Sequence, residues 1–205
     1  MDARQQSPST ARNREPILAV LRRVLPPRAK VLELASGTGE HAVFFAAAMP
    51  GLDWRPSDPS EEARASIAAW TQAEGLTNIA VPRDIDVSAA LWGVEDEAPF
   101  DALIAINMIH ISPWEATLGL MAGAGRLLRP GGMLFTYGAY KQEGRHTAPS
   151  NESFDQWLKA RDERFGVRDL EAVEAAANAQ GLALRESVEM PANNFALVFT
   201  CNGRD

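Results

Sequence analysis

The sequence predicts an α/β protein built on a doubly wound, largely parallel sheet. Short apolar segments typical of buried strands alternate with segments of helical periodicity along most of the 205 residues. A glycine turn, "GTG" at residues 37–39, follows the first apolar run and leads into a helix. The last two predicted strands are joined only by "PANN", which is too short for a parallel crossover, so this pair must be antiparallel.

The N-terminal segment is predicted to be a flexible polar arm over residues 1–12, followed by a single domain over residues 13–205. In "EPILAVLRRVL" the apolar residues recur at helical spacing, and Pro16 suits the first turn of a helix. Pro26 and Pro27 end this helix.

Two helices are expected in the first half of the chain. "HAVFFAAAM" is one, and "PSEEARASIAAWTQAEG" is the other, with Ser60 as its N-cap and Gly75 at its end. Proline is disfavoured inside a sheet, so we place Pro56 near the end of its strand. The strands of this half are expected at residues 30–36, 52–58 and 78–87.

The second half continues the alternation. Ser112 and Glu115 form a predicted capping box with proline between them, which opens a helix through Leu128. Two further helices are predicted over 154–164 and 169–180. Four strands, expected at residues 100–111, 133–140, 182–190 and 193–201, bring the sheet to seven, of which the last is antiparallel.

The composition limits the class of protein and its partners. The chain has no apolar leader and no apolar run of transmembrane length, and its one cysteine, Cys201, excludes an intramolecular disulfide. The net charge of −7 argues against a broad nucleic-acid surface. We therefore expect a cytoplasmic protein with no membrane or nucleic-acid partner, and the sequence leaves a homodimer open. No cluster has metal-ligand spacing, so no metal site is predicted.

The glycine turn fits two ligands. Gly37-x-Gly39-x-x-Ala42 matches a dinucleotide fingerprint, whereas Glu33-x-Ala35-x-Gly37-x-Gly39 matches a loop that holds S-adenosylmethionine (SAM). A carboxylate at Glu33 can reach the amino group of a methionine moiety but would repel a pyrophosphate. These considerations favour SAM.

Acidic residues after the next two predicted strands suit the rest of this ligand. Asp58 follows the second strand at a spacing that suits a ribose diol with either ligand. Asp86 and Asp84 compete for the amino group of adenine, and we prefer Asp86.

Together, "VLELASGTGEH", "PSDPS", "DIDV", "INMIH" and "LLRPGGMLFTYG" resemble a class I SAM-dependent methyltransferase. "RNREPIL", "RFGVRDL" and "MPANN" resemble a methyltransferase-like family long listed as a domain of unknown function, and the resemblance runs from about Arg12 to Thr200. It implies a Rossmann-like fold, a seven-stranded sheet with an antiparallel last strand, and SAM as cofactor with S-adenosylhomocysteine (SAH) as product. Ala35 replaces the first glycine of the common loop pattern. The expected cofactor-binding residues are Glu33, Ala35, Gly37, Gly39, Asp58, Asp86, Val87 and Asn107.

The acceptor is expected to meet three polar segments, "RNR", "YKQEGRHTAPSN" and "PANN", which we predict to close over it as a lid. A general base is needed only if the acceptor must lose a proton. The candidate catalytic residues are His110, His146 and Tyr140, and the candidate substrate-binding residues are Asn13, Arg14, Tyr137, Asn151, Asn193 and Asn194.

The sequence thus predicts direct methyl transfer from SAM to a small-molecule acceptor. Two alternatives stay open: a protein that keeps the SAM fold but binds without turnover, and a nicotinamide-dependent oxidoreductase, which only the glycine fingerprint supports.

Overall fold

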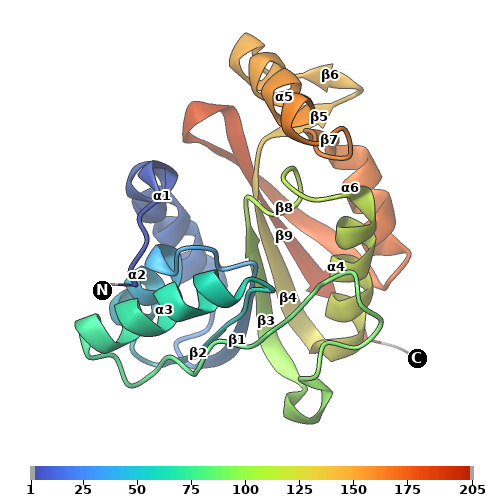
Figure 1. The fold of residues 1–205 in the computed structure, drawn as a ribbon. Coiled ribbons are helices and arrows are strands. Elements are labelled where there is room, and N and C mark those ends of the chain that lie inside the picture. Colours follow the sequence, from blue (N-terminus) through green and yellow to red (C-terminus); the bar gives the residue numbers. More distant parts are fainter. Residues whose placement is uncertain (1–2, 204–205) are drawn as a thin grey trace.

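A six-stranded sheet with the order β2-β1-β3-β4-β9-β8 forms the centre of the molecule (Figure 1). The computed structural model describes residues 3–203. β1 to β4 pair in parallel, whereas β9 is antiparallel to both of its neighbours, which confirms the antiparallel pair expected from the short "PANN" link. The strands are β1 (Ala29–Leu34), β2 (Leu52–Pro56), β3 (Phe100–Ile106), β4 (Leu128–Gly138), β8 (Leu182–Met190) and β9 (Asn194–Cys201).

Helices cover both faces of this sheet, as a doubly wound fold requires (Figure 1). α1, α2 and α3 lie on one side and α4 and α6 on the other, and a separate apolar core fills each side. No helix within residues 3–203 is long and apolar enough to span a membrane. The helices are α1 (Pro8–Val24), α2 (Glu40–Ala48), α3 (Glu61–Glu74), α4 (Trp114–Leu127), α5 (Pro149–Arg161) and α6 (Leu170–Asn178), with short 3₁₀ turns η1 (Glu95–Glu97) and η2 (Pro191–Asn193).

The predicted seventh strand, residues 78–87, is wrong. This segment runs beside β2 but makes only isolated parallel bridges, Trp54 to Ile79 and Ser57 to Arg83. Pro82 interrupts it, because proline has no N–H with which to continue a ladder.

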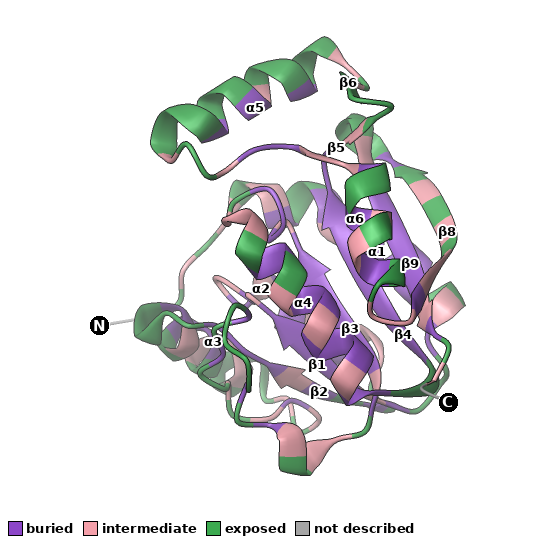
Figure 2. Cartoon of the chain, turned by 90° about the vertical axis from the view of Figure 1, so that its right-hand side faces the viewer, coloured by how far each residue is buried: buried purple, intermediate pink, exposed green. Residues whose placement is uncertain are grey.

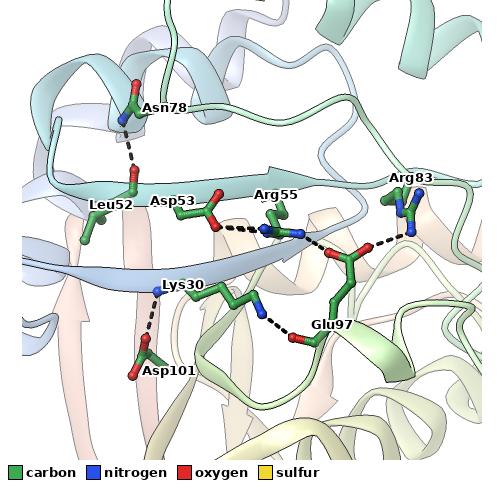
Figure 3. Close-up of polar contacts among 8 residues, drawn as sticks. All are labelled: Lys30, Leu52, Asp53, Arg55, Asn78, Arg83, Glu97 and Asp101. Carbon is green, nitrogen blue, oxygen red and sulfur yellow. Dashed lines mark hydrogen bonds and ion pairs between the residues drawn. The ribbon is translucent and has the colours of Figure 1, made fainter.

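A polar network holds this irregular segment and the following turn against the sheet (Figure 3). The Asn78 amide donates to the Leu52 carbonyl at 3.1 Å. The Glu97 carboxylate pairs with Arg83 at 2.6 Å and also with Arg55 of β2. These side-chain contacts add to the backbone hydrogen bonds that residues 78, 80 and 83 make with β2 and with Asp58.

The N-terminal arm differs from the prediction, because α1 begins at Pro8 and Pro16 lies inside the helix. Residues before the helix are also bound to α3. The backbone N–H of Gln5 donates to Ser66 Oγ at 2.8 Å, and Trp70 Nε1 donates to the backbone carbonyl of Gln5 at 2.8 Å. A polar sequence alone does not show such docking. Residues 1–2 of the predicted arm lie outside the described residues.

The predicted helix caps have different outcomes. Ser60 caps α3 as expected, since its Oγ accepts from the Ala63 amide at 3.3 Å, and Gly75 ends the helix in a left-handed conformation. The capping box at Ser112 is wrong. Pro113 is the N-cap of α4, and the Ser112 hydroxyl instead donates to the Met108 carbonyl at 2.8 Å.

The long segment after β4 folds as a cap, which we define as residues 139–169. It contains α5 and a small sheet of β5 (Tyr140–Gln142), β6 (Arg145–His146) and β7 (Arg168–Asp169). In Figure 2, α5 forms a separate layer with a largely exposed outer face. Inside the cap, the buried Asp155 accepts from Lys159 Nζ at 2.8 Å and from the Val167 amide at 2.7 Å. Asp155 therefore links α5 to the residue that precedes β7.

Gly39 and Gly37 offer a matched test of how the turn after β1 is built. Both have positive φ, +86° and +55°. A Cβ at Gly39 would lie 2.8 Å from Ile67 Cα of α3, whereas one at Gly37 would meet nothing within 4 Å.

Gly37→Ala should therefore cost only backbone strain, about 1–2 kcal/mol. Gly39→Ala should cost that strain plus overlap with α3, about 1–3 kcal/mol more. Urea denaturation of the two variants measures the difference, and an equal loss in both would show that α3 does not press on the turn.

Candidate functional site

Two cavities lie side by side at the carboxyl ends of the parallel strands, and Ile111 lines both. We name them the Asp58 cavity and the His110 cavity. The Asp58 cavity has a volume of about 770 Å³ and is lined by Ala35, Asp58, Pro59, Ile85, Asp86, Val87, Ser88, Met108, Ile111, Ser112, Pro113, Glu115, Ala116 and Arg164. The His110 cavity has a volume of about 760 Å³ and is lined by Ser9, Arg12, Asn13, Asn107, His110, Ile111, Tyr137, Ala139, Ser150, Asn151, Phe154, Trp157, Pro191, Ala192, Asn193 and Asn194.

Asp58 organises the turn at the edge of the first cavity. Its Oδ2 accepts from the Gly37 amide at 3.0 Å and its Oδ1 accepts from the Ser60 amide at 2.9 Å. The carboxylate thus joins the turn after β1 to the start of α3. Each oxygen carries a second lone pair, so Asp58 can still accept two hydrogen bonds from a ligand in the cavity. Ala35 adopts φ +52° at the point where the common pattern has glycine, and it still lines this cavity.

Glu33 lies beneath the turn and is not among the residues that line either cavity. Its side chain is 1% exposed and accepts from Trp54 Nε1 at 3.0 Å. Burial raises the pKa of Glu33 from 4.5 to about 7, against the opposing effect of hydrogen bonds from Trp54 and Ser36. The structure therefore places Glu33 as a brace for the turn, where direct contact with the cofactor was expected.

The two candidates for the adenine amino group are separated by the structure. Asp86 lines the Asp58 cavity, and its Oδ1 accepts from the Ser88 hydroxyl at 2.6 Å and from the Ser88 amide at 2.9 Å. These bonds lower the pKa of Asp86, so it is ionised at neutral pH. Asp84 is outside both cavities and pairs with Arg64 at 3.2 Å. Val87, also predicted, lies beside Asp86 on the wall.

The loop after β3, residues 107–111, separates the two cavities. Asn107 has φ +59°, and its backbone N–H donates to the Tyr137 carbonyl at 2.8 Å. Asn107 lines the His110 cavity and not the Asp58 cavity, and its predicted contact with the cofactor stays a prediction. Met108 lines the Asp58 cavity and Ile111 lines both, which makes this loop the shared wall.

His110 is 4% exposed and lies on the wall of its cavity. Its ring contacts Phe154 edge to face at 5.2 Å. A Cβ at Gly138 would lie 2.8 Å from His110 Nδ1, so the glycine leaves room for the ring. Burial, with the charge of Arg168, lowers the pKa of His110 to about 4. The imidazole is therefore neutral at physiological pH and available as a proton acceptor.

Five of the six predicted substrate-binding residues come together in the His110 cavity: Asn13, Tyr137, Asn151, Asn193 and Asn194. They belong to α1, β4, α5 and the link between β8 and β9. Tyr137 is hydrogen-bonded to Asn13 and Asn194, and Asn13 Oδ1 lies 2.7 Å from His41 Nε2. Asn151 Nδ2 donates to the Asn193 carbonyl at 2.8 Å, which connects α5 to the hairpin.

Three predicted residues lie elsewhere. Arg14 stacks on Phe44, 4.6 Å from the ring centroid, because residues 12 and 14 of one helix point in different directions. Tyr140 is 1% exposed, and this burial raises its pKa against the opposing effect of a hydrogen bond with Thr136 Oγ1 at 2.9 Å. His146 lines a different, polar cavity and lies 3.4 Å from Asp155. Tyr140 and His146 therefore belong to the interior of the cap and not to the His110 cavity.

Several wall residues were missed. Met108 and Ile111 belong to "INMIHI", residues 106–111, whose apolar residues could have been assigned to the cavity wall as well as to the strand. Arg12 lies in the predicted segment "RNR" but was not chosen from it, and the end of the cap brings Arg164 to the Asp58 cavity without a local signal.

Glu33→Gln tests the buried carboxyl through the pH dependence of stability. Because the pKa is raised to about 7 in the folded protein, Glu33 contributes stability that is full below 4.5 and lost as the pH rises through 7. The glutamine variant lacks this loss and can still accept from Trp54. Its stability relative to wild type should rise by about 3 kcal/mol between pH 4.5 and pH 8.

Chemical denaturation at several pH values measures this difference. Glu74→Gln, at an exposed position in the last turn of α3, is the control and should track the wild type. A constant offset between Glu33→Gln and wild type at every pH would mean that folding does not raise the pKa of Glu33.

The chain matches the family described as "Protein of unknown function (DUF938)" over residues 4–201. Among solved structures, an O-methyltransferase family protein from Burkholderia thailandensis has a TM-score of 0.80 at 17% identity, covering 96% of this chain and 58% of its own. A putative sarcosine dimethylglycine methyltransferase from Galdieria sulphuraria has a TM-score of 0.75 at 14% identity, covering 95% of this chain and 86% of its own.

A third structure, CalO1, is a methyltransferase in calicheamicin biosynthesis in its SAH-bound form. It has a TM-score of 0.72 at 17% identity, covering 93% of this chain and 54% of its own. This chain thus spans little more than half the length of the Burkholderia and calicheamicin proteins. The chain belongs to the DUF938 family, and its fold is that of the class I SAM-dependent methyltransferases.

Proposed function

We propose that this protein transfers the methyl group of SAM to a small-molecule acceptor. The observation that carries the proposal is the pair of cavities of nearly equal volume on the two sides of the loop 107–111. A group transfer needs two ligands whose reacting atoms meet, and Ile111 borders both cavities at the place where such ligands would meet.

The Asp58 cavity fits SAM better than a nicotinamide dinucleotide. Asp58, Asp86 and Glu115 line it with only one cation, Arg164, so a pyrophosphate would face an excess of negative charge. The ribose hydroxyls suit the open lone pairs of Asp58, and the adenine amino group suits the oxygen of Asp86 that Ser88 leaves free. When bound, SAM supplies a methyl group that its sulfonium already makes electrophilic.

The protein's own contribution is then alignment and proton acceptance. The polar wall of the His110 cavity can orient an acceptor, and the cap can limit water access to it. His110, neutral and without a hydrogen-bond partner for its ring among residues 3–203, can take a proton from an acceptor that must lose one. The solved structures with this fold support the reaction class. The acceptors of those proteins are not assigned to this chain.

Asp58→Ala should weaken SAM and SAH binding by about 1.5–3 kcal/mol, because two charge-assisted acceptors are lost from the cavity. Calorimetry with SAM, SAH and NAD measures this and also separates the oxidoreductase alternative. Asp84→Ala is the matched control, since Asp84 lies outside both cavities. If both variants bind SAM like wild type, the Asp58 cavity does not hold the ribose.

His110→Gln should lower methyl transfer by about 100-fold when the acceptor must be deprotonated, while SAM affinity stays within about threefold. His146→Gln is the matched control, because His146 lies in the other cavity and should leave the rate unchanged. An acceptor found by screening thiols, amines and carboxylates with labelled SAM allows the rates to be compared. Full activity in His110→Gln and reduced activity in His146→Gln would reverse the two assignments.

The low pKa of His110 also sets an expectation for pH. The imidazole loses its role as base only when it is protonated, and its pKa is lowered to about 4. The rate of transfer should therefore not fall near pH 6.5, where an exposed histidine would titrate. A fall in the transfer rate near pH 6.5 that is absent in His110→Gln would show that this ring is exposed to solvent in the bound complex.

A further inference from the structure

The His110 cavity contains one permanently cationic side chain and no acidic one. Among its lining residues, Arg12 is the arginine, no aspartate or glutamate is present, and His110 is neutral at physiological pH. In a chain whose net charge is −7, a cavity wall of this kind is a local reversal of the overall charge.

Arg12 lines this cavity and has no ion-pair partner within residues 3–203. Its charge acts on the phenol of Tyr137, which lines the same cavity, while Arg14 two residues later lies on Phe44. No carboxylate within residues 3–203 forms an ion pair with the Arg12 guanidinium. The five N–H donors of Arg12 are therefore available to a ligand.

The α5 wall of the cavity has a different character. Phe154 and Trp157 stack with ring centroids 5.9 Å apart and planes 18° apart, and Trp157 is 51% exposed. Ile111, on the wall shared with the Asp58 cavity, is 48% exposed. Such large apolar side chains are exposed at the surface of the cavity and suit a flat, apolar ligand body.

From this arrangement we infer that the acceptor is a small planar carboxylic acid. Its carboxylate pairs with Arg12 beside Asn13 and Asn194, and its body lies against Phe154 and Trp157. A single guanidinium matches one carboxylate in charge and in its two-pronged geometry, whereas a phosphate would bring about two charges. The inference rests on the proposed function, because it assigns the ligand of the second cavity.

The test uses the full chain saturated with SAH and three matched probes: 4-hydroxybenzoate, 4-hydroxybenzamide and 4-(aminomethyl)phenol. Calorimetry should show the acid binding at least about tenfold more tightly than the amide, with no binding of the amine. Arg12→Gln should reduce the preference for the acid to about twofold or less. Arg14→Gln, on the other face of the same helix, should keep it, and Arg12→Lys should restore part of it.

Equal binding of acid and amide to wild type, an unchanged preference in Arg12→Gln, or no binding of the acid would overturn the inference. Tighter binding of 4-hydroxyphenyl phosphate than of the benzoate would overturn the choice of a carboxylate. Each of these failures is distinguishable from failure of the proposed function, which loss of SAH binding or absence of methyl transfer to any acceptor would show. Circular dichroism of each variant confirms that the fold is kept.

Discussion

The parallel register of β1, β2, β3 and β4 is the constraint on which both cavities depend. Glu33 pairs with Pro56 and with Ile104, and Ile106 pairs with Tyr137, so the strands end at one level. The loops that leave this edge carry Asp58, the turn at Gly37 and the segment 107–111. A shift of one strand by one residue would turn its side chains to the opposite face and separate these groups.

The second cavity depends on a more distant assembly. Its walls come from the start of α1, the end of β4, the cap and the hairpin between β8 and β9, which span most of the chain. In Figure 1, the hairpin tip lies between α1 and α5. Asp155 holds the cap together through Lys159 and Val167, and burial of its carboxylate is outweighed by these bonds and by the charges of Lys141 and Lys159, so its pKa is lowered. The wall that α5 contributes to the His110 cavity therefore depends on the contacts that hold the cap together.

Burial gives similar side chains different chemistry. Glu33 and Asp58 are both largely buried, yet Asp58 accepts from two backbone N–H groups whereas Glu33 accepts from Trp54 Nε1, and burial raises the pKa of Glu33 to about 7. Among the histidines, His41 and His110 have a pKa lowered to about 4 by burial. His41 is bound to Asn13, whereas the ring of His110 faces the cavity.

What could be predicted from the sequence follows from short-range rules. Ala35 lies directly after a strand, and Asp58 and Asp86 follow the next segments, so their meeting at the Asp58 cavity required only the parallel topology. The strand β8 agrees with the predicted residues 182–190, because its period-two pattern is local. In contrast, residues 78–87 have the composition of a strand, but Pro82 and the neighbouring polar network decided their conformation.

Only the tertiary structure decided which polar residues line the His110 cavity. Tyr140, His146 and Asn151 stand in one polar stretch, yet only Asn151 lines the His110 cavity, because the fold of the cap buries Tyr140 and directs His146 to a different cavity. Arg12 and Arg14 look alike in "RNR", but α1 begins before them and turns them to different sides. The orientation of a side chain depends on the helix or sheet that carries it and on what packs against that element. The residues next to it in the sequence determine neither of these.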